Sequence, residues 1–140
     1  HSWGPRNEAG LGGPMQWDCG HFDKDFAFHI VAKVERNLTD TTLLHGYILE
    51  NGKVYGLVKG KGQTAREGYE QREISYELID ATGRRFFIKG EAISLLPWMA
   101  WPNVCVYTSL TQWECEGRMG YGDAQHAFPI SYIRRRKGLM

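Results

Sequence analysis

The sequence predicts an all-β fold, an antiparallel up-and-down barrel or strongly curved half-barrel of seven or eight strands with little helix. Two observations lead to this prediction. Long stretches alternate apolar and polar residues, the period of a half-buried strand. Short clusters of Gly, Asn and Asp separate these stretches, as expected for strands joined by hairpin turns. Closure is favoured over an open sheet because it removes exposed edges.

The first elements follow from local composition. Residues 1–16 are rich in Gly and Pro and predict an irregular loop. Residues 26–35, FAFHIVAKVE, predict the first clear strand. Its two faces are apolar (Phe26, Phe28, Ile30, Ala32 and Val34) and polar (His29, Lys33 and Glu35).

Hairpins account for the middle and the end of the chain. In residues 41–60, two β-rich runs flank Asn51-Gly52, the preferred dipeptide of a type I′ turn. Residues 72–96 repeat the pattern around Asp80–Gly83, and the extended segments 103–115 and 118–133 meet at Glu116-Gly117. Thr64 and Glu67 have the spacing of a helix-capping box, but Gly68 and the missing apolar stripe favour a strand-to-strand turn.

Three further segments lead to separate structural predictions. Residues 95–104, LLPWMAWPNV, read as a loop that forms a cavity mouth, a partner contact or a plug. Gly120 and Gly122 are expected to relieve crowding at a strand bend. The basic run at residues 134–137 predicts a solvated tail over residues 134–140.

The composition is that of one soluble globular domain spanning residues 1–140. A net charge of +1 gives no field that attracts nucleic acid. No apolar run reaches the length of a transmembrane segment. Cys19, Cys105 and Cys115 form neither a disulfide framework nor a zinc motif, which favours a reducing, cytoplasmic setting without a metal or other cofactor.

Two motifs resemble the two-part proteins grouped with hydroxyneurosporene synthase and the AttH-like family. Members carry Arg-Asp-His-Ser-Trp-Gly-x-Arg in mid-chain and, later, a Gly-Arg-x-Gly-Tyr-Gly-like turn followed by an acidic or amide residue and His. The residues that match the first motif are His1, Ser2, Trp3, Gly4 and Arg6. Those that match the second are Gly117, Arg118, Gly120, Tyr121, Gly122, Gln125 and His126.

The resemblance implies a lipocalin-like barrel with an apolar pocket, and that this chain is the C-terminal part of a longer protein. Its family includes hydratases and cyclases of isoprenoids and polyenes. In this chain, residues 19–28 contain aspartates but lack the Tyr-x-Asp pair of the hydratases. Such chemistry needs a proton donor and aromatic faces that stabilise positive charge. The candidate catalytic residues are His1, Asp18, Asp23, Asp123 and His126, and the candidate ligand-binding residues are Trp3, Trp17, Trp98, Trp101, Trp113 and Tyr121.

Each candidate also has a structural interpretation. His126 alternates with Ala124 and Phe128, a position where a hydrogen-bonded core histidine is more common than a catalytic one. Arg6 and Arg118 are expected to form scaffold ion pairs with Asp18, Asp23 or Asp123. The function predicted first is binding of a hydrophobic small molecule in the barrel. The alternatives are a hydratase- or cyclase-type lyase, and a scaffold that docks against an N-terminal half or a second copy.

Overall fold

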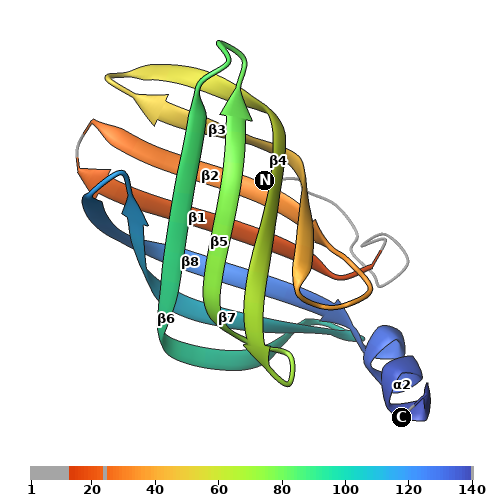
Figure 1. Cartoon of the computed structure of the whole chain (residues 1–140). Coiled ribbons are helices and arrows are strands. Elements are labelled where there is room, and N and C mark those ends of the chain that lie inside the picture. Colours follow the sequence, from red (N-terminus) through yellow and green to blue (C-terminus); the bar gives the residue numbers. More distant parts are fainter. Residues whose placement is uncertain (1–12, 24, 140) are drawn as a thin grey trace.

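The computed structural model describes residues 13–23 and 25–139, which form a closed barrel of antiparallel strands followed by a helix (Figure 1). Each strand pairs with the next along the chain, and β1 pairs with β8 to close the barrel. This confirms the predicted all-β, up-and-down fold. The elements are β1 (Met15–Asp23), β2 (Phe26–Val34), β3 (Asp40–Glu50), β4 (Lys53–Glu67), β5 (Glu70–Asp80), β6 (Arg85–Trp101), β7 (Val104–Cys115), β8 (Arg118–Pro129) and α2 (Ile130–Leu139).

The turns form where the sequence predicts them. Asn51 and Gly52 have φ angles of 52° and 78°, and Glu116 and Gly117 have angles of 51° and 83°. Two consecutive residues with positive φ are the requirement of a type I′ hairpin turn. The capping-box segment is not a helix, because β4 continues to Glu67 and the chain turns at Gly68.

Three predicted boundaries are wrong. Met15 and Gln16 belong to β1 rather than to the initial loop, because both pair with β2 and with β8. Residues 130–139 form helix α2, so the predicted extended segment 118–133 ends at Pro129, and the basic run lies on a helix and not in an irregular tail. The remainder of the predicted initial loop, residues 1–12, lies outside the described residues.

The third wrong boundary is the predicted loop at residues 95–104, most of which belongs to β6. Pairing between β5 and β6 ends at Glu73 and Glu91, whereas pairing between β6 and β7 continues to Trp101. From Ala92 onward β6 therefore pairs on one side only. Pro97 lacks an N–H group but fits there, because an edge strand leaves alternate N–H groups without a ladder partner.

The barrel interior is filled in its middle. Ile30, Ile48, Leu78 and Ile88 have no exposed surface, so no space the size of a water molecule adjoins them. They belong to an apolar cluster with Phe28 and other buried residues of β2 to β8. The expected wide lipocalin-type cavity is therefore replaced by packed side chains at this level.

Glycines allow the closing strands to approach each other. A Cβ atom on Gly122 would overlap the carbonyl oxygen of Cys19, and one on Gly120 would overlap that of His21. Both carbonyls belong to β1, which pairs with β8 at these positions. The two glycines thus relieve crowding at the β1–β8 junction, as predicted.

Helix α2 begins directly after β8. The backbone N–H of Ile130 donates a hydrogen bond of 2.7 Å to the carbonyl oxygen of Asn103 in the β6–β7 turn. In the described part of the chain, no helix has both the length and the apolar composition needed to cross a bilayer.

Candidate functional site

Asp18 and His126, two of the candidate catalytic residues, lie side by side inside the barrel. Asp18 comes from β1 and His126 from β8, and the alternation of both strands turns these side chains inward. The Oδ1 atom of Asp18 lies 2.9 Å from Nε2 of His126, and neither side chain has any exposed surface. Arg66 from β4 completes the group, with its Nη1 atom 3.0 Å from Nδ1 of His126.

The contacts define the protonation of His126. A guanidinium group only donates hydrogen bonds, so Nδ1 of His126 accepts one from Arg66. Nε2 then carries the proton and donates a hydrogen bond to Oδ1 of Asp18, so the imidazole is neutral. Burial lowers the pKa of His126, and Asp18 opposes this shift without cancelling it.

Three more side chains form hydrogen bonds within this group. Tyr76 donates its hydroxyl to Oδ2 of Asp18, and burial together with the nearby carboxylate raises the pKa of Tyr76. The amide of Gln16 donates to both Asp18 and Tyr76. The Oε1 atom of Gln16 accepts hydrogen bonds from Thr64 at 3.1 Å and from Arg66 at 2.6 Å. We call Gln16, Asp18, Thr64, Arg66, Tyr76 and His126 the buried polar network.

Aromatic side chains close this end of the barrel. Phe128, which has no exposed surface, packs against Tyr69 and Tyr107, with ring centroids at 5.1 and 5.8 Å. The guanidinium of Arg66 lies 5.2 Å from the Phe128 ring centroid. Burial lowers the pKa of Arg66 to about 10, which still leaves it protonated at neutral pH. Asp18 and His126 therefore offer no surface to a substrate, and their geometry is that of a structural network.

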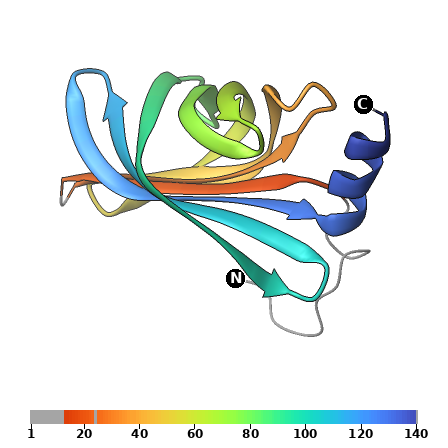
Figure 2. The same ribbon diagram turned by 90° about the horizontal axis from the view of Figure 1, so that it is seen from below.

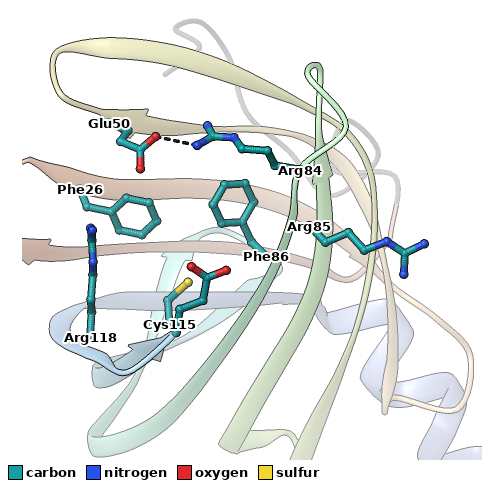
Figure 3. Close-up of a pocket in the computed structure, with 8 residues that line it drawn as sticks. Phe26, Glu50, Arg84, Arg85, Phe86, Cys115 and Arg118 are labelled. Carbon is teal, nitrogen blue, oxygen red and sulfur yellow. Dashed lines mark hydrogen bonds and ion pairs between the residues drawn. The ribbon is translucent and has the colours of Figure 1, made fainter.

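The opposite end of the barrel is open. A hollow of about 340 Å³ lies there, between the β3–β4, β5–β6 and β7–β8 turns (Figure 3). The rings of Phe26 and Phe86 lie next to each other in it, tilted by 37° and with centroids 6.2 Å apart. We call this hollow the mouth; it is lined by Phe26, Glu50, Arg84, Arg85, Phe86, Cys115, Glu116 and Arg118.

Arg84 is held tightly at the mouth. Its Nη1 atom donates to Glu50 at 2.7 Å and its Nε atom donates to Asp80 at 2.9 Å. Burial of Asp80 raises its pKa, but hydrogen bonds from Thr82 and Arg84 outweigh this and lower it to about 2. Arg84 is thus a fixed, neutralised part of the wall, stacked 5.1 Å from the Phe86 ring centroid.

Arg118 is held much more loosely. Its guanidinium lies 4.9 Å from the Phe26 ring centroid, and its ion pair with Asp23 has a length of 3.9 Å. The predicted pairing of Arg118 with Asp23 is thereby confirmed, but both side chains are about half exposed and the contact is weak. Arg85 points away from the two rings, toward Glu77 (Figure 3). Arg118 is consequently the loosely held cation that lies beside the two rings.

The thiol at the mouth is not an activated nucleophile. Cys115 is buried, and burial raises its pKa to about 11. A thiol with such a pKa is protonated at neutral pH, and only the thiolate attacks. The mouth therefore offers binding groups and no reactive group.

The remaining candidates do not gather at one site. Asp23 and Asp123 are exposed. Trp17 packs in a small outer cluster with Val104, Val106 and Ala127. Trp98 and Tyr121 are exposed, and Trp113 is fully buried against Phe28. His1, Trp3 and the side chain of Trp101 lie outside the described residues.

Sequence reasoning did not select the residues of the mouth. The sequence places Phe26 only on a strand face, and it places Arg118 in a motif and an ion pair but not among the ligand-binding candidates. Phe86, Arg84 and Glu50 were not singled out at all. The available signal was the grouping of aromatic and charged residues next to three predicted turns, because alternate turns of an up-and-down barrel share one end.

A second hollow, of about 530 Å³, lies on the outside of β4 to β7. Its lining includes Glu73, Glu91, Glu114 and Lys89, whose side chains are exposed. This surface is charged and solvated, without the aromatic floor of the mouth.

The comparisons with known proteins identify a family without an assigned activity. The family described as Domain of unknown function (DUF7064) matches residues 1–130. No curated protein and no solved structure matches the chain.

Proposed function

This chain belongs to the family described as Domain of unknown function (DUF7064), and we propose that it binds a small hydrophobic molecule with an anionic head group at the mouth of the barrel. The observation that carries the proposal is a weakly paired Arg118 stacked on Phe26, whose ring adjoins that of Phe86. The two rings, each 4% exposed, provide a small apolar floor, and the guanidinium provides a partner for a carboxylate.

The shape of the mouth sets the size of the ligand. Its volume of about 340 Å³ is at the lower end of the range found for small-molecule sites. The filled middle of the barrel stops a long chain from entering deeper. The ligand is therefore short or only partly enclosed, in contrast to the extended polyenes that the sequence resemblance implies.

A second candidate function is favoured by the filled middle of the barrel. Packed side chains are what a rigid scaffold needs, and such a domain docks through its outer surface against an N-terminal half or a second copy. A lyase acting through Asp18 and His126 has less support, because both side chains are sealed.

Isothermal titration calorimetry with decanoate tests the proposal. We expect decanoate to bind and both decanol, which lacks the charge, and acetate, which lacks the tail, to bind much more weakly. Replacing Arg118→Gln should weaken decanoate binding about fivefold, the effect of roughly 1 kcal/mol for one partly exposed charged hydrogen bond. Equal affinities for decanoate and decanol, or no heat with either, would contradict the proposal.

Arg85→Gln is the matched control. Arg85 precedes the β6 residue Phe86 and carries the same charge, but it points away from the rings. Its replacement should leave the affinity for decanoate unchanged. An equal loss in both variants would mean that the overall charge of this end attracts the ligand, without a defined site.

A further inference from the structure

The β6–β7 hairpin contains a long uncharged segment, part of which is exposed on β6 and part of which is buried on β7. Residues 92–113 contain no Asp, Glu, Lys, Arg or His, and no other uncharged stretch of the chain is as long. Exposed edges in soluble proteins are normally protected by charged side chains, above all Lys. We call this segment the uncharged arm.

Apolar side chains on this arm are exposed. The exposed fractions are 64% for Leu96, 44% for Trp98 and 54% for Met99, and Leu110 on β7 is also exposed. Beyond Glu91 the β6 strand of the arm is an edge strand, because β5 no longer pairs with it (Figure 2), whereas β7 remains paired with β8 as far as Val104 and Pro129. The exposed apolar side chains of β6 therefore lie on an unpaired edge of the sheet.

A basic helix begins at the tip of the arm. The hydrogen bond from Ile130 to Asn103 attaches the start of α2 to the β6–β7 turn. Residues 134–137 of this helix read Arg-Arg-Arg-Lys, and residues 124–140 contain no acidic residue. An uncharged edge strand with exposed apolar side chains is thus joined to a segment of strong positive charge.

We propose that the uncharged arm and helix α2 dock together on an anionic lipid surface. Lipid is favoured over a protein partner because a bilayer excludes charged residues from every inserted position, and β6 carries no charged residue after Glu91, whereas a protein interface keeps a polar rim. Trp98 suits the lipid boundary, where tryptophan is enriched. Its Nε1 atom already donates to Oγ1 of Thr108 at 2.8 Å, so that insertion leaves no donor unpaired.

The positive charge of α2 supplies the second contribution to membrane attachment, after the apolar contact of the arm. A shallow apolar contact alone gives weak membrane binding, and stable attachment usually combines it with basic residues that attract anionic head groups. The arm lies at the end of the barrel opposite to the mouth, so this inference does not depend on the proposed ligand site.

Co-sedimentation with vesicles tests the inference. We expect binding to vesicles of phosphatidylcholine and phosphatidylserine at a ratio of 3:1, and at least tenfold weaker binding to phosphatidylcholine alone. Leu96→Glu should reduce binding at least tenfold, and Arg134→Glu or 0.5 M salt should also weaken it. Val58→Glu is the control, since Val58 is 66% exposed on β4 outside the arm.

Two results would overturn the inference. One is equal binding of the Leu96→Glu and Val58→Glu variants, with circular dichroism showing that both remain folded. The other is no vesicle binding at all, together with a dimer in native mass spectrometry that Leu96→Glu dissociates. In that case the arm is a contact surface between two copies of the chain.

Discussion

The two ends of the barrel interior use similar side chains in opposite ways. At the mouth, Arg118 lies beside an aromatic ring and is half exposed, with one long ion pair. At the closed end, Arg66 also lies beside an aromatic ring, but it is largely buried and hydrogen-bonded at Nε, Nη1 and Nη2. The difference shows that partners and burial decide the role of a charged group. The charged groups of the closed end stabilise the fold, whereas Arg118 at the mouth remains able to bind a ligand.

The largest effect that this comparison predicts is the loss of Asp18. In Asp18→Ala, the donors of His126, Tyr76 and Gln16 lose their common acceptor inside the barrel. We expect the free energy of unfolding to fall by about 3–5 kcal/mol, as is usual when one member of a buried charged group is removed. Urea denaturation measures this change.

Asp23→Ala provides the matched control near the mouth. Its carboxylate is about half exposed and makes a 3.9 Å ion pair with Arg118. We expect a change of less than about 1 kcal/mol in the free energy of unfolding. Similar losses in both variants would show that the two ends do not differ as described.

The β1–β8 junction leads to a second prediction. In Gly122→Ala, the new methyl group overlaps the carbonyl oxygen of Cys19, so the backbones must separate. We expect a loss of about 1–3 kcal/mol, the usual effect of overpacking. Gly56→Ala is the control, because no atom lies within 4 Å of its added Cβ and the strand backbone accepts alanine. Thermal unfolding measures the stability of both variants. A Gly122→Ala variant as stable as the wild-type protein would contradict the predicted crowding.

The buried polar network also predicts a pH dependence. The pKa of folded His126 lies below its usual value, mainly because of burial, whereas the unfolded histidine titrates near 6.5. Below that pH the unfolded state binds more protons, so stability falls as the pH falls, by at most about 1.4 kcal/mol per pH unit for this one group.

Urea denaturation between pH 7.5 and 5 measures this dependence. The wild-type protein should lose more stability across this range than a His126→Gln variant, which lacks the titrating group. Burial also lowers the pKa of His29, but that residue is common to both proteins. Parallel curves for the two proteins would contradict a neutral, buried His126.

The smallest predicted change in stability is that of Arg118→Gln. Its ion pair is long and exposed, so the free energy of unfolding should change by less than about 1 kcal/mol. The same variant should nevertheless weaken decanoate binding. A loss of several kcal/mol would mean that Arg118 is part of the scaffold after all.

The fold followed from the sequence where the signals were local. The alternation from Phe26 to Val34 and the turn at Asn51-Gly52 depend on a few neighbouring residues, and both were predicted correctly. The segment from Leu95 was misread as a loop, because Pro97 normally ends a strand. Its acceptance on a one-sided edge depends on the length of β5, which no local pattern reveals.

The sites were harder to predict than the fold. Asp18 and His126 were both singled out, but their contact joins the first and last strands and depends on barrel closure. Arg66 was missed because its role requires β4 to place it across the interior from β8. Burial is likewise a property of the assembled barrel, so the sequence could not separate a sealed Asp-His pair from an accessible one.

An NMR titration of isotopically labelled protein with decanoate tests the central claim most directly. If the middle of the barrel is filled and the mouth is the binding site, the signals of Phe26, Phe86 and Arg118 should shift and reach a plateau as decanoate is added. Those of Asp18, Tyr76 and His126 should remain unchanged. Shifts centred on the buried polar network, with an unaffected mouth, would contradict the account.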